Sequence, residues 1–353
     1  MAWSLRLFRI AGTDVKVHVT FLLILGFFWI QGGPAAALML LGIFACVLLH
    51  EFGHIAMAKR FGVRTPDVIL LPIGGVARLE RMPDEPRQEL LIALAGPFVT
   101  LLIAVLLYAW LAATGETPPV VSGLDATPDN YIAELYRINV LLLLFNMIPA
   151  FPMDGGRVLR ALLAHRLGLS RATRIAATVG QALAFIIGFY AISQNAILLV
   201  LIAFFIFIGA SGEAAAVATR IAGQGLVVRD MMVTDFRTLP IYATLADAAN
   251  LLVAGDQREF PVVDNLGSVE GLLTRDDLVR GLSLHGPGAL AREVMRVGAE
   301  PVTPDITFDR ALERLRETRL PALPVVEGGR LVGLLTTDNI TDLLLVRRAV
   351  ARG

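Results

Sequence analysis

The sequence predicts an α-helical membrane domain of about six transmembrane helices with a small membrane-associated β-hairpin, followed by a cytoplasmic α/β domain built from two repeats. Three observations predict this architecture. Of the 353 residues, 56% are hydrophobic and 18% are charged, and the mean hydropathy is +0.67. Apolar runs long enough to cross a bilayer recur up to about residue 222 and then stop. Beyond that point short apolar and charged stretches alternate in a pattern that occurs twice.

Six apolar runs are candidate spans, because a membrane-crossing helix needs about 20 mostly apolar residues. These runs are residues 17–32, 35–61, 89–114, 129–148, 172–192 and 196–220. The first run follows basic residues but lacks a small-residue cleavage site, so we interpret it as a span and not as a signal peptide. Lysine and arginine gather between spans two and three and between spans four and five, whereas the opposite loops carry none. The positive-inside rule therefore predicts a multi-pass protein of the cell membrane with cytoplasmic N- and C-termini.

The charges and the single cysteine exclude other classes. Lysine plus arginine and aspartate plus glutamate both number 31, so no basic field indicates a nucleic-acid partner. Cys46 is the single cysteine, which excludes an intrachain disulfide and a cysteine-rich zinc ribbon, and we interpret it as a small buried hydrophobe.

Glu134 and Arg137, three residues apart on a predicted helix, are expected to pair with each other.

The second predicted span contains three ionisable residues in the segment HEFGH. His50 and His54 are four residues apart, so on a helix they lie on one face and can reach one metal ion. Glu51 stands beside them, where it can accept a proton from water at that metal. Ionisable groups are expensive in lipid and usually mark a functional site. The segment therefore predicts a metal site within the membrane.

A catalytic zinc needs a third protein ligand and one open position. The best source is the segment NMIPAFPMDGG, where Pro149 and Pro152 interrupt the end of the fourth apolar run. Lipid tolerates such a helix break only where protein or water supplies partners for the backbone. Gly155 and Gly156 then allow a close turn, so Asp154 is expected to project toward the histidines.

These two segments resemble the motifs of the site-2 protease family of intramembrane zinc metalloproteases. The resemblance implies one Zn2+ per chain, held by His50, His54 and Asp154. It also implies that Glu51 is the catalytic base and that Asn146 lies near the scissile peptide bond, where its amide holds the substrate or the developing oxyanion.

The resemblance runs from GTDVKVHVTFLLIL, near residue 12, through the sixth span. The segment AGPFVTLL at 95–102 is similar to the family's third-span signature, although Thr100 stands where asparagine is frequent. We expect this departure to affect a packing contact and to leave the metal site unchanged.

The implied activity is hydrolysis of a peptide bond within or near a transmembrane segment of a single-span membrane protein. Glu51 is expected to accept a proton from the attacking water and to return it to the leaving amine. Water would reach the site from the cytoplasmic side, and a helical substrate would unwind locally in the bilayer. An anti-sigma factor, a sigma-factor precursor and a signal-peptide remnant are the substrate classes that the resemblance suggests.

The segment VILLPIGGVARLE, residues 68–80, is typical of a hairpin or a re-entrant loop, and Pro72 favours an edge strand. In the resembling family a comparable sheet lies near the active site. Pro72, Gly74 and Gly75 are therefore candidates for docking an extended substrate by strand addition. An interfacial loop that only covers the helices is the alternative.

The C-terminal part contains two copies of one unit. VRDMM at 228–232 matches AREVM at 291–295, and FPVVDNLGSVEGLLTRDDL matches LPVVEGGRLVGLLTTDNI. Each copy predicts a helix, two strands joined by a turn, and a second helix. The expected domains are residues 1–222, 226–285 and 289–348.

The repeats resemble CBS domains, which pair into modules that bind adenine nucleotides. The resemblance implies ATP, ADP or AMP as a ligand and a homodimer through the module. The segments TRDD and TTDN make Thr274, Asp277, Thr336 and Asn339 candidates for phosphate and ribose contacts, with Asn339 in place of the commoner aspartate. The alternative is that these residues only cap their helices.

CBS pairs also occur on channels and transporters, so a CBS-gated metal-ion transporter or channel is the alternative function. A transport path usually needs polar groups in several spans or inverted repeats. Spans one, three, five and six offer few such groups. The glutamate directly after the first histidine has a hydrolytic role and no obvious role in transport, which favours the protease.

Overall fold

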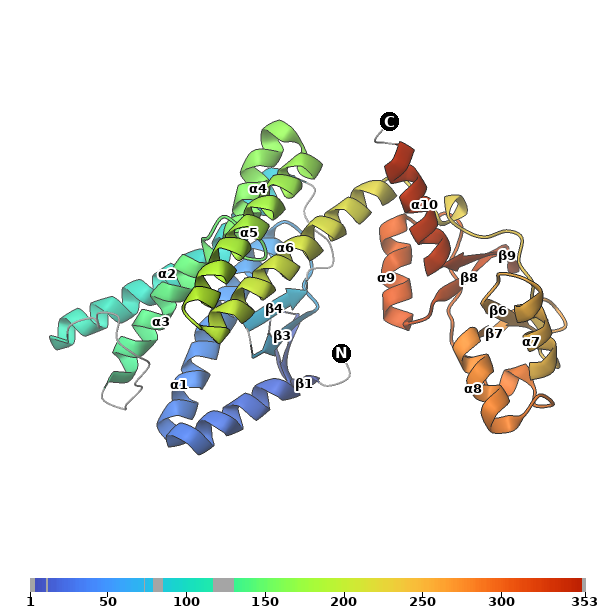
Figure 1. Ribbon diagram of the computed structural model, residues 1–353, viewed down its shortest axis with the longest axis horizontal. Helices are drawn as coiled ribbons and strands as arrows, with labels where there is room; N and C mark the ends of the chain where they lie inside the picture. Colours follow the sequence, from blue (N-terminus) through green and yellow to red (C-terminus); the bar gives the residue numbers. More distant parts are fainter. Residues whose placement is uncertain (1–3, 11, 73, 79–84, 117–129, 351–353) are drawn as a thin grey trace. The chain divides into compact units, whose positions relative to one another are not determined.

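The computed structural model describes residues 4–10, 12–72, 74–78, 85–116 and 130–350 (Figure 1). The chain divides into two units, Met1–Val217 and Ala218–Gly353, and each is described by itself. Part of the predicted outer loop at 115–130 and part of the segment at 68–80 lie outside the described residues.

The N-terminal unit contains a four-stranded sheet in the order β1-β2-β3-β4. Its strands are β1 Ser4–Ile10, β2 Thr13–His18, β3 Asp67–Leu71 and β4 Gly74–Arg78. Strands β2 and β3 are parallel, and β3 and β4 are antiparallel with Leu71 opposite Gly74. The sequence predicted a small hairpin only. The segment GTDVKVHVTFLLIL resembles the entry to the first span, so the sequence does not predict β1 and β2; in the structure the residues of β2 alternate in burial, with Val15 and Val17 inside.

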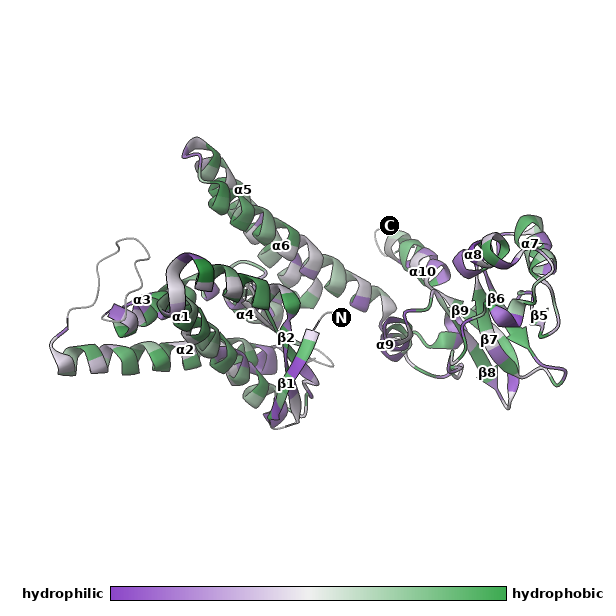
Figure 2. Ribbon diagram, turned by 90° about the horizontal axis from the view of Figure 1, so that it is seen from below, coloured by the Kyte–Doolittle hydropathy of each residue, from purple (hydrophilic) through white to green (hydrophobic). Residues whose placement is uncertain are grey.

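Six helices, α1 to α6, follow in the described part of this unit, and the last of them, α6, continues past Val217 into the second unit. They are α1 Val19–Arg60, α2 Pro86–Thr114, α3 Tyr131–Asn146, α4 Asp154–Leu167, α5 Leu169–Ser193 and α6 Ile197–Gly223. In the described part of the chain, four helices are long and apolar enough to cross a membrane, namely α1, α2, α5 and α6. Figure 2 shows that these helices are hydrophobic along most of their length.

Helix α1 contains the first two predicted spans on either side of a bend. Figure 1 shows the bend in α1. Gly33 interrupts the helix with φ 65° and ψ −164°, a positive φ that glycine adopts without strain, and Pro34 follows. Helix α3 has 16 residues, fewer than a full span requires. The total of six spans therefore stays a prediction.

The C-terminal unit contains the two repeats. The first has β5 Leu239–Pro240, α7 Leu245–Ala254, β6 Glu259–Val263, β7 Val269–Thr274 and α8 Arg275–His285. The second has α9 Phe308–Thr318, β8 Ala322–Glu327, β9 Arg330–Thr336 and α10 Thr337–Val350. Each repeat contains the antiparallel strand pair and the following helix that the sequence predicted.

The repeats exchange their leading segments. The backbone of Leu272 in β7 exchanges two hydrogen bonds, of 3.0 and 2.9 Å, with Arg296, which precedes the second repeat. The backbone of Leu334 in β9 exchanges two, of 2.9 and 2.8 Å, with Val233, which precedes the structured core of the first. Each repeat thus completes its sheet with a segment that leads into the other, so the two form one module.

Candidate functional site

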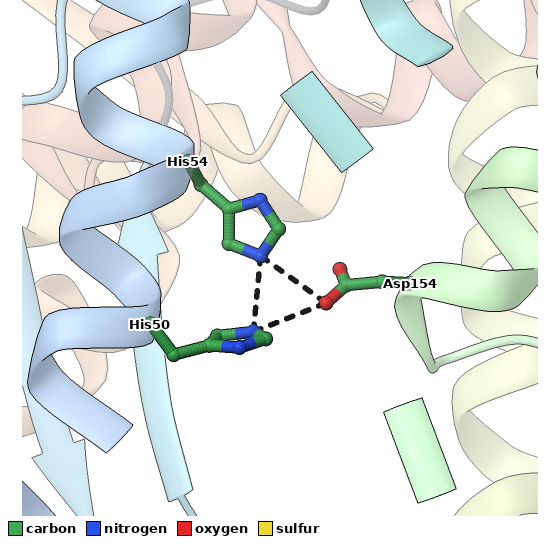
Figure 3. Close-up of side chains that lie close together, drawn as sticks. All are labelled: His50, His54 and Asp154. Atoms are coloured by element: carbon green, nitrogen blue, oxygen red, sulfur yellow. Dashed lines mark hydrogen bonds and ion pairs between the residues drawn. The ribbon is translucent and has the colours of Figure 1, made fainter. Parts of the chain in front are cut away.

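Three side chains from two helices converge at a candidate metal centre (Figure 3). His50 and His54 lie one turn apart in α1, and Asp154 is the first residue of α4. The two Nε2 atoms are 3.1 Å apart, and each is 3.1 Å from Oδ2 of Asp154. Among the residues that the structure describes, these three are the group of histidine, cysteine, aspartate and glutamate side chains close enough to hold a metal ion.

The geometry and the donor set of this centre fit zinc. Tetrahedral zinc with bonds of about 2.0–2.1 Å separates its ligand atoms by about 3.3 Å, close to the observed spacing. Two imidazole nitrogens and a carboxylate oxygen face one another, an acceptor set that is stable only with a cation or protons between its members. All three side chains are buried, so water does not satisfy them from several sides.

Helix α2 orients both imidazoles from behind. Nδ1–H of His54 donates to the backbone oxygen of Ile92 at 2.7 Å. Nδ1–H of His50 donates to Oγ1 of Thr100 at 2.8 Å, and that hydroxyl donates in turn to the oxygen of Gly96 at 3.4 Å. These bonds leave both Nε2 lone pairs for a metal. The expectation that Thr100 affects only packing is therefore wrong, because its hydroxyl fixes the orientation of a candidate ligand.

Glycines let α2 approach the histidines closely. A Cβ on Gly96 would lie 2.7 Å from Nε2 of His50 and would also collide with the His54 ring. On the opposite helix, a Cβ on Gly53 would lie 2.6 Å from the backbone oxygen of Ala95. Sequence reasoning missed both glycines, since single glycines in apolar helices are common and nothing in the pattern shows which helix faces them.

The predicted helix break places the aspartate. Gly155 and Gly156 lie against the backbone that runs from Met147 to Phe151, and a Cβ on Gly156 would stand 2.5 Å from the Phe151 nitrogen. Phe151 itself is buried. The predicted helix break and the close approach of the glycines are confirmed, but the glycines do not form the turn: they are helical residues in the first turn of α4. Asp154 stands at the N-terminus of that helix, where a negative charge is favourable.

Glu51 is half-buried and lies beside the sheet. A Cβ on Gly75 of β4 would stand 2.7 Å from Cγ and 3.2 Å from Oε1 of Glu51, so this strand passes directly over the carboxylate. Gly74 starts β4 with φ 138°, and Pro72 lies in the turn before it and not in an edge strand. Of the three predicted docking residues, Gly75 is the one that contacts the candidate base.

Asn146 is the last residue of α3 and is half-buried. Its predicted place beside the scissile bond stays a prediction.

Elsewhere in the same helix, Nη2 of Arg137 lies 2.5 Å from Oε2 of Glu134, and both side chains are buried. The predicted pairing of these two residues is confirmed.

A buried arginine in α4 was missed. Arg160 was counted among the basic residues between spans four and five, but it is only 2% exposed. Its Nε donates to Oε1 of Glu89 in α2 at 2.6 Å, and Nη1 donates to Oε1 of Glu213 in α6 at 2.7 Å. The two glutamates inside apolar runs were the available sequence signal, because a carboxylate in a span requires a partner.

Of the four candidate nucleotide contacts in the C-terminal unit, Thr274 and Thr336 cap helices, and Asp277 and Asn339 are the residues whose backbone N–H groups they accept from. Oγ1 of Thr274 accepts from the backbone N–H of Asp277 at 3.2 Å and donates to its Oδ2 at 2.6 Å. Nε of Arg296 donates to the same Oδ2 at 2.7 Å. Burial raises the pKa of Asp277, but the hydrogen bonds from Arg296 and Thr274 outweigh it and hold the pKa below its ordinary value.

In the second repeat the neutral residue Asn339 stands in the place of Asp277. The backbone N–H of Asn339 donates to Oγ1 of Thr336 at 3.0 Å, and its Nδ2 donates to the backbone oxygen of Met231 at 2.5 Å. Asp277 and Asn339 thus both hold the leading segment of the other repeat, one through an ion pair and one through an amide.

A cavity of about 460 Å³ lies between the two repeats. Its charged lining consists of Arg258, Glu259, Arg275, Asp276, Arg296, Arg319 and Asp338. Thr274 and Thr337 also contribute to the wall. Four arginines and three acidic residues line the cavity, and Arg258 pairs with Asp338 while Arg296 pairs with Asp277, so the lining is of mixed charge with a small excess of arginine.

Comparison with known proteins gives matches over both units. Peptidase family M50 matches residues 38–120 and 117–187, and the CBS domain matches 228–284 and 291–346. The chain is 32% identical over 352 residues to zinc metalloprotease MJ0392 of Methanocaldococcus jannaschii, and the match covers 96% of each chain. It is 32% identical over 164 residues to stage IV sporulation protein FB of Bacillus subtilis, covering 46% of this chain and 52% of that protein. A solved structure of a site-2 protease from M. jannaschii is 36% identical, with a TM-score of 0.47, covering 60% of this chain and 95% of that one.

Proposed function

The chain belongs to peptidase family M50, the site-2 protease family of zinc metalloproteases, and on this premise we propose that it cleaves single-span membrane proteins under the control of adenine nucleotides. It is a multi-pass membrane metalloendopeptidase, and its family acts on membrane proteins within the bilayer. This family assignment favours the protease over the transporter that the sequence left open. The observation that carries the proposal is the convergence of two histidines and an aspartate beside a half-buried glutamate.

We assign His50, His54 and Asp154 as the ligands of one Zn2+. When bound, zinc supplies a Lewis acid that makes water nucleophilic near neutral pH and stabilises negative charge on the scissile carbonyl oxygen. The three side chains supply one ligand atom each, which leaves a fourth position open. Thr100 and the backbone of Ile92 hold the imidazoles in the required orientation, so little reorganisation is needed on binding.

Glu51 is the proposed base. Its carboxylate accepts a proton from the attacking water and delivers that proton to the leaving nitrogen. The Asn146 amide is proposed to donate to the carbonyl oxygen of the scissile bond. Both roles require a substrate that is locally extended, because a helical segment shields its own backbone.

The sheet offers a means of holding such a substrate. Within the described residues β4 pairs with β3 alone and is the last strand of the sheet, so its other edge is where a further strand could be added. We propose that an unwound substrate segment adds to this edge, with Gly74 giving room for a substrate side chain, Gly75 allowing the strand to lie against Glu51, and Pro72 fixing the turn. The contact between Gly75 and Glu51 supports this docking, since a strand beside β4 lies next to the base.

The proposed topology has six spans, cytoplasmic N- and C-termini and the hairpin of β3 and β4 at the membrane. The distribution of lysine and arginine supports it, as does the division of α1 by Gly33 into two apolar halves. Residues 1–222 then form the protease domain, and 226–285 and 289–348 form the CBS repeats. An anti-sigma factor, a sigma-factor precursor and a signal-peptide remnant are the proposed substrate classes.

We propose one site for ATP, ADP or AMP in the cavity between the repeats, with the arginines facing the phosphates. Thr274 and Asp277 are the proposed phosphate and ribose contacts. Thr274 lines the cavity, whereas Asp277 is not among the lining residues but is bonded to Thr274 and Arg296, so Arg296 must release it for the ribose to bind. The side chain of Asn339 is committed to a backbone oxygen, so Thr336 and Asn339 form the weaker position.

A homodimer through the CBS module is supported by exposed apolar side chains at equivalent helices of the two repeats. Val279 and Leu284 are exposed on α8, and Leu345 and Val346 are exposed on α10. Two copies meeting through these helices would bury all four side chains.

The test of the proposed function is a comparison of membrane peptides in cells that express the wild type and Glu51→Gln. Peptides from single-span proteins should accumulate in the variant, because loss of a general base slows hydrolysis about 100-fold or more. Glu116→Gln, at an exposed position after α2, is the matched control and should accumulate none. Equal peptide profiles for the wild type and Glu51→Gln would refute the proposed mechanism.

A further inference from the structure

The ion cluster around Arg160 joins three helices inside the N-terminal unit. Its guanidinium binds Glu89 of α2 and Glu213 of α6 and lies over the ring of Phe151, with Cζ 4.9 Å from the ring centroid. The side chains of Arg160, Glu89 and Glu213 are 2%, 9% and 21% exposed. The assigned catalytic roles do not use any of these groups.

The cluster stands on the same face of α2 as the groups that orient the metal ligands. Glu89, Ile92, Gly96 and Thr100 follow one another at spacings of three and four residues, so they lie along one face of the helix. Ile92 and Thr100 bind the imidazoles, and Glu89, one turn earlier, binds Arg160. This face of α2 therefore binds the two histidines through Ile92 and Thr100, and binds α4 through Glu89.

Arg160 also holds the segment that presents the aspartate ligand. It lies in the helix that Asp154 starts, and Phe151 beneath its guanidinium belongs to the turn just before that aspartate. The guanidinium is thus fixed to α2 through Glu89 and touches the turn through Phe151. A shift of α4 along α2 would break these contacts and would move the carboxylate away from the imidazoles.

Burial of the Arg160 and Glu89 charges, with Glu213 half-buried beside them, is a costly way to gain stability alone. Desolvation offsets most of the attraction within a buried ion pair, and apolar replacements of similar volume are often neutral or stabilising. Buried polar groups do fix a unique arrangement in some proteins, because their partners are satisfied in only one geometry. The position of this cluster between two ligand-bearing parts is consistent with that second role.

We propose that Arg160 is a positioning residue that, through Glu89, fixes α4 relative to α2 and thereby holds Asp154 in reach of the two histidines. Glu213 adds a third attachment from α6 and makes a smaller contribution, because its carboxylate is the most exposed of the three. This inference rests on the proposed function, since it takes the two histidines and the aspartate as zinc ligands.

The test compares metal retention with folding in the purified full chain. Arg160→Met is loaded with Zn2+, and release to a chelator is timed; Co2+ is then substituted and its visible absorption spectrum recorded. Zinc release should be about tenfold faster than in the wild type, the scale seen when groups supporting metal ligands are lost. The Co2+ spectrum should change in intensity, since one ligand no longer holds its geometry. Arg137→Met, which removes a buried arginine that pairs with Glu134 in α3, is the control and should release zinc at the wild-type rate.

A double variant separates positioning from stability. Arg160→Met combined with Glu89→Met removes both charges of the main pair, so thermal stability should recover toward that of the wild type. Zinc release should nevertheless stay fast, because the attachment between α2 and α4 is still missing. Wild-type zinc retention in the double variant, or equal release from the Arg160 and Arg137 variants, would overturn the positioning role alone. A wild type that binds no metal would overturn the proposed function as well.

Discussion

The metal centre and the nucleotide-type positions differ in how their polar groups are satisfied. At the metal centre, α2 occupies the Nδ1 atoms of both histidines, while the two Nε2 atoms and Oδ2 of Asp154 face one another. In the C-terminal unit, Asp277 is already bound by Thr274 and Arg296. Facing acceptors at metal-ligand spacing need a cation or protons between them, whereas groups that already have hydrogen-bond partners serve the fold unless a ligand displaces those partners. The metal centre is therefore better prepared to bind its ligand than the nucleotide-type positions are, and the following experiments test that difference.

The largest effect is expected from removal of a metal ligand. His50→Ala should abolish zinc binding at the site and lower the cleavage rate by roughly 1,000-fold, because the metal contributes several kcal/mol to the transition state. Zinc content and cleavage of a reconstituted membrane substrate measure this. His165→Ala, on the exposed part of α4, is the control and should keep both. Full cleavage activity of the metal-free variant would show that the mechanism does not need the metal.

Gly96→Ala tests the close approach of α2. The added methyl group would collide with both imidazoles, and overpacking of about 1–3 kcal/mol weakens zinc retention by up to about 100-fold. Gly188→Ala is the matched control, because a Cβ there would lie at an ordinary 3.5 Å from the Cβ of Ala203. Similar zinc retention in the two variants would show that α2 does not set the ligand geometry.

Thr100→Val removes the hydroxyl that orients His50 and keeps the shape of the side chain. Zinc affinity should fall about tenfold, the lower end of the effect of losing such a hydrogen bond. Thr100→Ser keeps a hydroxyl and should restore most of the affinity. Competition with a zinc chelator measures both, and a Val variant as tight as the wild type would return this residue to a packing role.

A smaller effect is expected in the C-terminal unit, where a ligand must displace existing partners. Asp277→Ala should weaken ATP binding by about tenfold through loss of a charged hydrogen-bond acceptor, whereas Asn339→Ala should change it little. Equilibrium dialysis of the full chain with ATP, ADP and AMP measures this. Absence of binding by the wild type at millimolar concentration would leave the module as a dimerisation element.

The smallest effect concerns acid stability. The pKa of Asp277 is held below its ordinary value by Arg296 and Thr274 against the effect of burial, so its ionised form favours the folded state. This stabilisation is present at neutral pH, begins to be lost as pH falls toward the ordinary aspartate pKa near 4, and is gone below the lowered pKa. Thermal unfolding of the wild type and Asp277→Asn should therefore differ at pH 7 and converge at low pH. A constant difference across this range would contradict the assignment.

The sequence was most informative where ionisable residues or prolines interrupt an apolar run that would otherwise cross the membrane. Histidines and a glutamate in an apolar run, and prolines before Asp-Gly-Gly, predicted the ligands and the helix break, because such residues are costly without a purpose. The internal repeat likewise predicted the paired C-terminal strands and their capped helices.

What escaped prediction depends on contacts between distant segments. Thr100, Gly96 and Arg160 acquire their roles only when α2 lies against α1 and α4, and a one-dimensional pattern does not specify that arrangement. The strands β1 and β2 were missed for a related reason, since their short alternation merges with the first apolar run.

X-ray absorption at the zinc edge of the purified full chain tests the metal assignment most directly. We predict one zinc per chain with nitrogen and oxygen ligands only, two imidazole nitrogens among them, at about 2.0–2.1 Å. Asp154→Asn should lower the zinc content while leaving the chain folded. A chain that purifies active with no zinc, or with zinc bound through sulfur, would contradict the assignment of His50, His54 and Asp154.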